Sequence, residues 1–450
     1  MNTTDTTERG LEALIEESLI NEAQYVRGEY ADYDRAHCVD KVQLLRFLRT
    51  TQPQEIAWLE RSHGNLFEDK FLKRLFDQIR AKGIIEVLRN GIREREVALT
   101  LFYKKPASNL NETAAQHYAG NIFSITRQVR FSEDNKRLAL DMVIFINGLP
   151  VATFELKNNL TKQTVKDAIR QYQNDRDPRE PLFAFARCLV HFAVDDELIY
   201  MTTDLKGKQT TFLPFNKGFN HGAGNPVNEG GLKTDYLWKA ILSKDSLSNI
   251  IEKYAQIVSE TDENGMVKRK LVFPRYHQLD LVRKLLADAK ARGIGQRYLI
   301  QHSAGSGKSH SITWLSHQLV ELTNATNETP VLDSVIVVTD RRALDKQIRD
   351  NIKQFAQVKG VVEAITEGSR QLKDALRDGK KIIITTIQKF PFIVNEIGEF
   401  KASRFAIVID EAHSSQSGHS AGAMNVALSG IAEGEEETIE YVESLNEMEL

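Results

Sequence analysis

The spacing of hydrophobic positions changes along the chain and divides it into regions. Within residues 10–90, apolar side chains recur at helical spacing and predict a mostly helical segment. From about residue 97 to 157 the spacing becomes that of strands, with turn-forming residues between the apolar runs. A predicted helix (161–176) and two further predicted strands (185–194 and 197–203) follow. Together these stretches predict one α/β unit.

A polar stretch then separates this unit from a second pattern. The Gly- and Asn-rich residues 216–231 predict a long surface loop, and residues 236–258 have helical spacing. SETDENGMVKRK (259–270) is polar and rich in turn-forming residues, so it is the best candidate for a linker between domains. The acidic residues 433–450 predict a solvated helix or tail.

Beyond residue 270 the chain alternates strands and helices. The predicted strands are RYLIQHS (297–303), SVIVVTD (334–340), KIIITTI (381–387) and FAIVIDEAH (405–413). Continuously apolar strands that alternate with amphipathic helices indicate a parallel sheet covered on both faces. The predicted fold class is therefore α/β in both halves of the chain.

Composition and charge narrow the class of protein further. A chain of 450 residues with 41% hydrophobic residues suggests two to four domains with sizeable cores. The formal charge is only -3, so contact with nucleic acid would depend on local basic patches. Cys38 and Cys188 lack metal-ligand spacing. With no secretory signal pattern and no apolar run near the roughly 18 residues of a membrane span, a cytoplasmic protein without a membrane partner is expected.

A glycine-rich turn between a predicted strand and a predicted helix indicates a phosphate-binding loop. Its residues are Gly305, Ser306, Gly307, Lys308 and Ser309. Glycines let backbone N–H groups face an anion, the lysine reaches the β- and γ-phosphates of a nucleotide, and the serine hydroxyl can hold Mg²⁺. His302 occupies the first glycine position of the usual pattern, so a Gly/Ser connector with a solvated lysine is the alternative.

A second acidic motif follows the last predicted strand. Asp410 and Glu411 in IVIDEAH would place one carboxylate near a magnesium ion and a second near the attacking water, as phosphoryl transfer requires. The combination with the phosphate loop predicts binding of ATP and Mg²⁺.

Together with VIVVTDRRALDKQI (335–348) and TTIQKF (385–390), these motifs resemble motifs I, Ia, Ib and II of superfamily 2 helicases and translocases, whose motor lobes have the RecA-like fold. The resemblance implies that Gln278, upstream of the phosphate loop, reads adenine. It also nominates Arg341, Arg342 and Thr386 as contacts to a nucleic-acid backbone, although the arginine pair equally fits an ordinary solvated turn.

The stretch LALDMVIFINGLPVATFELKN (138–158) places charged residues in two apolar strands joined by Asn147-Gly148, a hairpin signal. A loop centred on Gly148 would set Asp141 opposite Glu155, with Lys157 further along the same face. Two adjacent carboxylates repel unless a cation lies between them, and Mg²⁺ prefers such ligands. A solvated Asp141–Lys157 ion pair is the alternative, but the flanking residues are too apolar for an exposed face.

This pattern resembles the core of the PD-(D/E)xK nucleases, with Asp141 as the acidic position and Glu155 and Lys157 as the ExK element. The resemblance suggests Glu12 as a further acidic residue on a preceding helix. RecB-like members carry Q-x-x-x-Y on the next helix, where Tyr172 matches the tyrosine. Ala168 replaces the glutamine of that element, and Gln171 is the residue that could take its role.

A nuclease followed directly by a superfamily 2 motor lobe is similar to the restriction (HsdR) subunits of type I restriction–modification enzymes. The expected fold is a restriction-endonuclease-like domain at 1–258, with a helical part at about 1–95 and a core at about 96–215. A linker at 259–270 and a RecA-like P-loop domain at 271–450 would follow. The resemblance implies ATP-driven translocation on double-stranded DNA, cleavage away from the recognition site of unmethylated DNA, and modification and specificity subunits as partners.

Two other functions fit the same motifs. A helicase–nuclease of DNA repair would act on free DNA ends without modification subunits, and a nucleotide- and DNA-binding module would bind without full motor activity. The chain ends soon after His413, before any second RecA-like lobe, so we expect this polypeptide to bind nucleotide but to hydrolyse it poorly.

Overall fold

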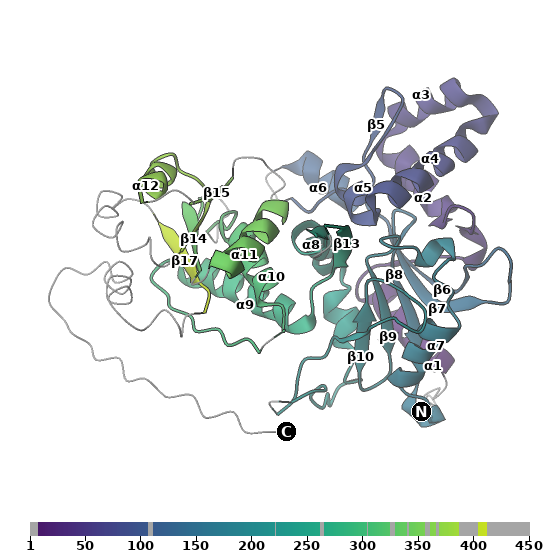
Figure 1. The fold of residues 1–450 in the computed structure, drawn as a ribbon. Coiled ribbons are helices and arrows are strands. Elements are labelled where there is room, and N and C mark those ends of the chain that lie inside the picture. Colours follow the sequence, from purple (N-terminus) through teal and green to yellow (C-terminus); the bar gives the residue numbers. More distant parts are fainter. Residues whose placement is uncertain are drawn as a thin grey trace. The chain divides into compact units, whose positions relative to one another are not determined.

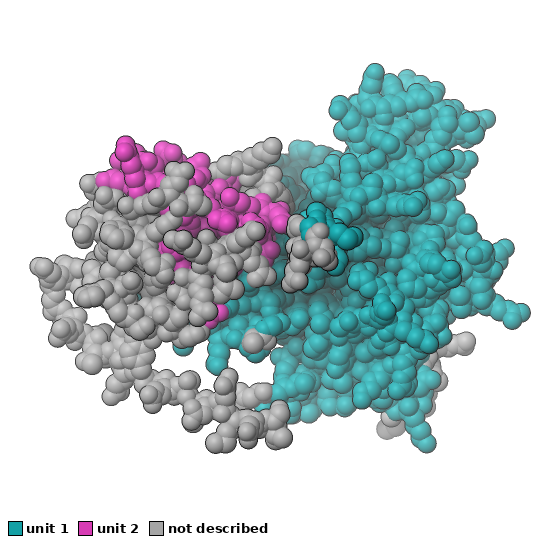
Figure 2. Space-filling model, viewed as in Figure 1, with its two compact units in different colours: residues 1–292, 297–318, 324–329 teal, residues 293–296, 319–323, 330–450 magenta. Residues whose placement is uncertain are grey.

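The computed structural model forms two compact units (Figures 1 and 2). The first comprises residues 1–292, 297–318 and 324–329, and the second comprises residues 293–296, 319–323 and 330–450. The structure describes residues 8–106, 111–220, 222–261, 265–303, 305–324, 329–339, 342–355, 361–365, 369–386 and 404–411. The predicted acidic tail at 433–450, Arg341 and His413 lie outside these residues.

A mixed seven-stranded sheet forms the centre of the first unit, in the order β1-β6-β7-β8-β9-β10-β11. Its strands are β1 (Val26–Arg27), β6 (Phe123–Arg130), β7 (Ala139–Ile146), β8 (Leu149–Leu156), β9 (Val190–Val194), β10 (Ile199–Thr202) and β11 (Leu213–Pro214). The neighbours β1 and β6, and β8 and β9, run parallel, whereas the other neighbours run antiparallel. The strands predicted from residue 123 to 203 are thereby confirmed.

The hairpin of β7 and β8 contains a bulge that the sequence analysis did not predict. Asn147 and Gly148 both have positive φ, 52° and 77°, which is typical of a two-residue type I′ turn. Next to the turn Ile146 pairs with Leu149, but further along Ile144 pairs with Ala152, so one extra residue lies in β8. This bulge, and not a loop centred on Gly148, sets the register in which Met142 faces Phe154.

The described part of the first unit also contains ten α-helices. They are α1 (Glu8–Asn21), α2 (Lys41–Thr51), α3 (Pro53–His63), α4 (Phe67–Lys82), α5 (Ile84–Asn90), α6 (Glu112–Ala119), α7 (Val165–Asn174), α8 (Lys244–Lys253), α9 (Tyr276–Arg292) and α10 (Lys308–Leu319). Of these, α1 and α7 contact the sheet most closely. The crossover helix α7 packs on β8, β9 and β10, and its buried Val165, Ala168 and Tyr172 join the main apolar cluster. A capping box at Thr164 and Asp167 starts this helix.

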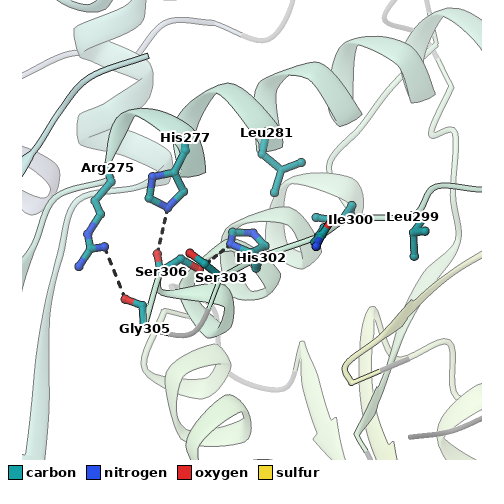
Figure 3. Close-up of a pocket in the computed structure, with 10 residues that line it drawn as sticks. Arg275, His277, Leu281, Leu299, Ile300, His302, Ser303, Gly305 and Ser306 are labelled. Atoms are coloured by element: carbon teal, nitrogen blue, oxygen red, sulfur yellow. Dashed lines mark hydrogen bonds between the residues drawn. The ribbon is translucent and has the colours of Figure 1, made fainter. Parts of the chain in front are cut away.

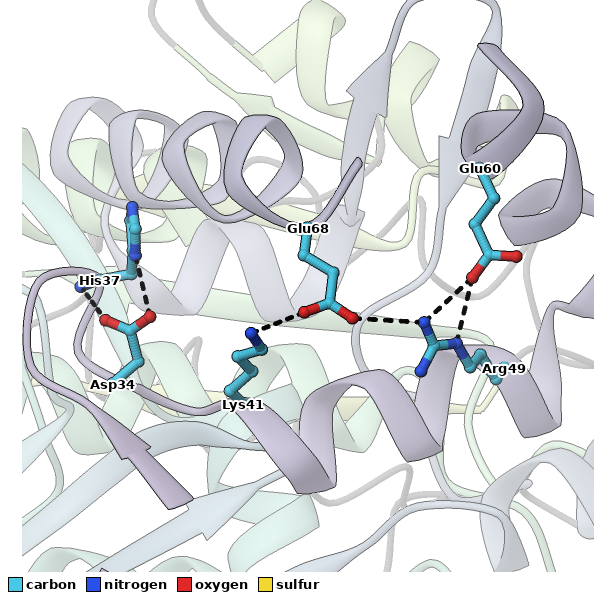
Figure 4. A network of polar contacts seen from close by, with 6 residues as sticks. All are labelled: Asp34, His37, Lys41, Arg49, Glu60 and Glu68. Atoms are coloured by element: carbon cyan, nitrogen blue, oxygen red, sulfur yellow. Dashed lines mark hydrogen bonds and ion pairs between the residues drawn. The ribbon is translucent and has the colours of Figure 1, made fainter. Parts of the chain in front are cut away.

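Ion pairs link the helices of the N-terminal part to one another (Figure 4). Lys41 of α2 lies 2.6 Å from Glu68 of α4, and Arg49 lies 3.0 Å from Glu60 of α3 and 3.5 Å from Glu68. These side chains are partly exposed, so each pair adds at most about 1 kcal/mol of stability. Apolar packing, including the fully buried Phe47 and Phe71, holds this part together.

The segment predicted as a linker is a β-hairpin instead. Strands β12 (Gln256–Thr261) and β13 (Val267–Val272) pair antiparallel, and Val258 and Leu271 are buried. The predicted helix at 236–258 is also shorter than expected, because it contains a π-helical turn (Leu237–Ile241) and α8 and then gives way to β12.

A parallel sheet forms the centre of the second unit, in the order β15-β16-β14-β17. Its strands are β14 (Ser334–Thr339), β15 (Val362–Ala364), β16 (Ile382–Thr386) and β17 (Phe405–Ile409), with helices α11 (Arg342–Phe355) and α12 (Ser369–Arg377). The apolar strands β14 and β16 are buried along their length. The predicted parallel sheet is confirmed.

One predicted strand of this region is wrong. Residues 297–303 form no regular strand, and Leu299 is 92% exposed. An apolar run predicts burial only if a partner surface covers it, and the described residues provide no sheet neighbour here. Short strands β2 (Tyr33–Asp34), β3 (Val39–Asp40), β4 (Ile92–Glu94) and β5 (Val97–Leu99) complete the described elements. Across the described part of the chain, no helix is long and apolar enough to cross a membrane.

Candidate functional site

The β7–β8 hairpin brings the predicted acidic pair together. Extending its register by one residue sets Asp141 opposite Glu155, as expected from the sequence. Without the bulge, Glu155 would lie opposite Leu140 and would point to the other face of the sheet. Asp141 Oδ2 also accepts a hydrogen bond from the backbone N–H of Leu156 at 2.7 Å. The two carboxylates therefore share one face of the sheet, at its centre.

Glu155 is fully buried and interacts with an arginine that the sequence analysis missed. Its Oε1 accepts a hydrogen bond from Arg176 Nε at 2.6 Å, and the side chain of Arg176 is only 4% exposed. Its Oε2 is buried and has no hydrogen-bond partner among the described residues. A buried carboxylate oxygen without a partner is costly, and an ion that the structure does not contain is one explanation.

The electrostatics of this pair follow from its burial. Burial, and next the negative charge of Asp141, raise the pKa of Glu155 well above its ordinary value, while Arg176 and Lys157 act in the opposite direction. Lys157 is 8% exposed and follows Glu155 by two residues at the end of β8. Its backbone N–H donates to Val194 of β9 at 2.9 Å, which fixes the start of the side chain beside the acidic pair.

Glu12 of α1 lies near the same cluster. Its carboxylate accepts hydrogen bonds from Arg127 and Gln128, each at 2.9 Å. Burial raises its pKa, and the charge of Asp141 acts in the same direction, whereas the bond from Arg127 opposes the shift. Both oxygens of Glu12 thus have protein partners, so a role as a metal ligand would require exchange of one of these bonds.

Tyr172 is buried beneath the sheet rather than exposed on a helix surface. Its hydroxyl lies 2.8 Å from Thr153 Oγ1, which in turn lies 2.7 Å from His191 Nδ1. Thr153 shares the face of β8 with Glu155, so this chain of polar groups supports the strand that carries the acid. Ala168, where the resemblance expects glutamine, is buried in the core, while Gln171 is partly exposed.

The donor set at the hairpin fits a divalent cation with few protein ligands. Among the described residues no cluster of three or more His, Cys, Asp or Glu side chains could hold a metal ion. Mg²⁺, however, needs only one or two carboxylates, because waters and substrate phosphate oxygens complete its shell. Asp141 and the unpartnered Oε2 of Glu155 supply those two carboxylates.

The predicted phosphate loop precedes α10, which begins at Lys308 and carries Ser309 in its first turn. Gly305 and Gly307 have φ of 71° and 85°, a backbone region that favours glycine. A Cβ at position 307 would also lie 2.3 Å from the side-chain nitrogen of Gln278. The backbone N–H of Ser306 donates to the carbonyl oxygen of Ser303 at 3.2 Å, so this N–H has a partner within the protein.

Gln278 contacts the backbone of the loop. Its Nε2 donates to the carbonyl oxygens of Ser306 and Gly307 at 3.1 and 2.9 Å, and its Oε1 accepts from the N–H of Arg275 at 2.9 Å. The side chain is 4% exposed. Its position beside the loop agrees with the prediction, but its amide is engaged in holding the loop, and adenine would have to replace one of these bonds.

An open pocket of about 550 Å³ lies beside the loop (Figure 3). It is lined by Arg275, His277, Leu281, Leu299, Ile300, Gln301, His302, Ser303, Gly305 and Ser306. His277 Nε2 lies 3.0 Å from the carbonyl of Ser306, and His302 Nδ1 lies 2.8 Å from its hydroxyl. Most of the lining residues are polar, and Leu281, Leu299 and Ile300 supply the apolar part of the wall.

The acidic motif of the second unit lies where the sequence predicts it. Asp410 directly follows β17, is 3% exposed, and its N–H donates to Val338 of β14 at 2.9 Å. Glu411 has a φ of 52°. Thr386 ends β16 and is 7% exposed. Arg342 begins α11, but its side chain lies outside the described part, so its nucleic-acid contact stays a prediction, as does a shared Mg²⁺ site of Ser309 and Asp410.

Two family models match this chain. Residues 19–210 match the family model of the type I restriction enzyme R protein N terminus, and residues 277–433 match the SWI2/SNF2 ATPase model. The first match includes Asp141, Glu155 and Lys157 but not Glu12. The second includes the phosphate loop and Asp410.

Curated relatives match across both regions. A type I restriction enzyme endonuclease subunit of Staphylococcus aureus (strain COL) is 25% identical over 87% of this chain and 39% of its own length. A corresponding subunit of Staphylococcus saprophyticus is 26% identical over 86% of this chain and 38% of its own. The type I restriction enzyme HindI endonuclease subunit of Haemophilus influenzae is 25% identical over 76% of this chain and 32% of its own length. The chain thus spans about two fifths of the length of the first relatives.

Proposed function

Since this chain belongs to the type I restriction enzyme R proteins and carries their N-terminal region, we propose that it is the nuclease and first motor lobe of such an enzyme. The observation that carries the proposal is the pairing of Asp141 with the buried Glu155, whose Oε2 lacks a protein partner. In this proposal the first unit contains a PD-(D/E)xK-type nuclease. The parallel sheet of the second unit belongs to a RecA-like lobe.

The residues of the hairpin would act together on a phosphodiester of double-stranded DNA. Asp141 and Glu155 would hold Mg²⁺, which activates water and stabilises charge on the scissile phosphate. Lys157, two residues along β8 from Glu155, would hold the attacking water or the negative charge that develops on the phosphate oxygens. The bulge in β8 keeps these groups on one face and so preserves the geometry that hydrolysis needs.

The nucleotide site would supply the motor. The N–H groups of the loop from Gly305 to Gly307 and the N-terminus of α10 suit phosphate oxygens, and Lys308 would contact the β- and γ-phosphates of ATP. Ser309 and Asp410 would hold the magnesium ion of the nucleotide, and Glu411 would orient water. ATP hydrolysis would drive movement on duplex DNA, with cleavage away from an unmethylated recognition site.

The complete enzyme implies further partners. The relatives are named endonuclease subunits, which implies an enzyme of several subunits. By the resemblance to type I restriction–modification enzymes, modification and specificity subunits would supply recognition of the DNA sequence and of its methylation state. Such an enzyme would work in the cytoplasm, where its DNA substrate enters. These properties belong to the whole assembly, of which this chain is one component.

Cleavage of circular unmethylated DNA by the complex reconstituted with its partner subunits tests the proposal. Lys157→Ala should bind DNA and ATP normally but cut about 10²-fold more slowly, because one charge that stabilises the transition state is lost. Lys308→Ala should abolish both ATP binding and cleavage. Lys166→Ala, which changes an exposed lysine of α7, is the matched control and should cut like the wild type.

The outcomes separate the competing functions. Wild-type rates from Lys157→Ala would contradict the nuclease site. Cleavage of free DNA ends without any modification subunit would favour a repair helicase–nuclease instead.

A further inference from the structure

Arg176 is fixed by contacts on three sides. Its Nε donates to Glu155 Oε1 at 2.6 Å, its second guanidinium nitrogen donates to the carbonyl of Ala139 at 2.8 Å, and its guanidinium lies 5.4 Å from the centre of the Phe131 ring. Ala139 begins β7, the strand that carries Asp141. One side chain therefore connects the two strands of the hairpin at the level of the acidic pair.

This arrangement determines which oxygen of Glu155 is available. Arg176 occupies Oε1, and the burial of the carboxylate leaves no other described partner for Oε2. A guanidinium presents its donors in a rigid plane, so it fixes the rotation of the carboxylate as well as its position. Rotation of Glu155 would break a short charge-assisted bond inside the protein.

We propose that Arg176 is a positioning residue of the nuclease centre, which holds Glu155 so that Oε2 faces a divalent cation shared with Asp141. The inference rests on the proposed nuclease function. Partners of metal ligands commonly act in this way, and their loss lowers metal affinity about 10- to 100-fold. Arg176 follows α7 by two residues, so the crossover helix that covers the sheet also delivers this support.

The opposite role for the same contact is that of a placeholder, a cation that leaves when the metal ion arrives. The anchoring contacts to Ala139 and Phe131 argue against it, because a placeholder needs freedom to move, and these contacts hold the guanidinium independently of the acidic pair. The two roles predict opposite effects on metal affinity when the arginine is removed.

The direct test measures Mn²⁺ binding to the full chain without nucleotide, by titration calorimetry, and counts only the binding that Glu155→Gln removes. Arg176→Met keeps most of the aliphatic part of the side chain. Arg176→Lys keeps the positive charge but loses the planar guanidinium that donates several hydrogen bonds. Positioning predicts 10- to 100-fold weaker Mn²⁺ binding for Arg176→Met and an intermediate loss for Arg176→Lys. Arg179→Met, which changes an arginine whose side chain is 90% exposed, is the matched control and should bind like the wild type.

Cleavage by the reconstituted enzyme provides a second measurement. For Arg176→Lys, the Mg²⁺ concentration that gives half-maximal cleavage should rise, while the cleavage rate at saturating Mg²⁺ should return close to that of the wild type. General destabilisation of the protein would lower the rate at every Mg²⁺ concentration. Thermal melting identifies the folded variants, and Arg176→Lys decides the matter if Arg176→Met does not fold.

Unchanged or tighter Mn²⁺ binding in the folded variants would overturn the positioning role. A wild-type chain without any Glu155-dependent Mn²⁺ binding would instead overturn the proposed nuclease site itself.

Discussion

Gln278 shows how a residue can lie where a sequence motif expects it and still have another task. Its amide bonds to the backbone of the phosphate loop at Ser306 and Gly307, so it holds the loop in shape. We therefore expect Gln278→Ala to weaken binding of ATP and of inorganic tripolyphosphate by the same factor, about tenfold for the loss of one to two hydrogen bonds. Equilibrium binding of both ligands measures this. A selective loss for ATP would show instead that Gln278 reads the base.

His191 makes the stability of the first unit depend on pH. Burial lowers the pKa of this histidine to about 3, whereas an unfolded histidine titrates near 6.5. Between these two pH values His191 is protonated in the unfolded chain but neutral in the folded chain. The stability that His191 contributes is therefore fully present above pH 6.5 and is lost as the pH falls toward 3, by about 2 kcal/mol at pH 5.

Urea unfolding at pH 7 and pH 5 tests this dependence on pH. His191→Asn should lose about 2 kcal/mol less than the wild type between the two values. His117→Asn, at an exposed histidine, should keep the wild-type difference. An identical pH dependence for the wild type and His191→Asn would contradict the assignment.

At the scale of elements, the β7–β8 hairpin depends on a close approach at its turn. A Cβ on Gly148 would lie 2.4 Å from the carbonyl oxygen of Asp40 and 2.6 Å from the backbone nitrogen of Leu44. Gly148→Ala should therefore cost several kcal/mol more than the 1–2 kcal/mol of a left-handed backbone alone. Gly207→Ala is the control, because Gly207 has a similar φ of +58° but a Cβ there would lie no closer than 3.8 Å to its nearest neighbour, the carbonyl oxygen of Gln173.

Thermal melting of Gly148→Ala and Gly207→Ala separates the cost of the close contacts at Gly148 from the cost of the left-handed backbone alone. The Gly148 variant should also lose Glu155-dependent Mn²⁺ binding, because the turn and the bulge together set the register of the acidic pair. Equal melting temperatures for the two variants would show that the contacts of Gly148 do not matter.

The hairpin also shows what the sequence could predict. Asn147-Gly148 indicates a turn through local backbone chemistry, and the apolar runs on either side indicate buried strands. The bulge in β8 depends on packing across the sheet, and no local pattern marks it. Arg176 lies in the charged stretch NDRDPRE, where an arginine normally indicates a solvated surface, so its burial against Glu155 depends on the tertiary structure.

The misassigned elements have related causes. RYLIQHS is apolar enough for a strand, but Leu299 and Ile300 remain exposed because burial depends on a neighbour that the sequence does not reveal. The hairpin of β12 and β13 was interpreted as a linker because its turn is polar, although Val258 and Leu271 anchor it. The prediction of β14 and β16 is correct because their runs of Val and Ile are continuous and the strands are buried.

At the scale of the whole molecule, compact units and sequence motifs divide the chain differently. The phosphate loop and α10 were predicted to belong to a domain at 271–450, yet they fall in the first compact unit. Trp314 of α10 is fully buried, donates from its indole N–H to the carbonyl of Tyr254 at 2.9 Å, and packs against the Tyr254 ring at 5.4 Å. Arg283 of α9 reinforces this attachment by donating to Ser246 and Asn249 of α8.

This packing predicts which elements lose stability when α10 is perturbed. Trp314→Ala should cost about 3–5 kcal/mol, because a large buried side chain leaves a cavity and an unpaired carbonyl. Hydrogen exchange should then speed up in α8 and β12 of the first unit, while β14 and β16 of the second keep their protection. Trp58→Ala, at a partly exposed position in α3, is the control and should leave α8 unaffected. Faster exchange confined to β14 and β16, with α8 and β12 unchanged, would contradict this account of how α10 is held.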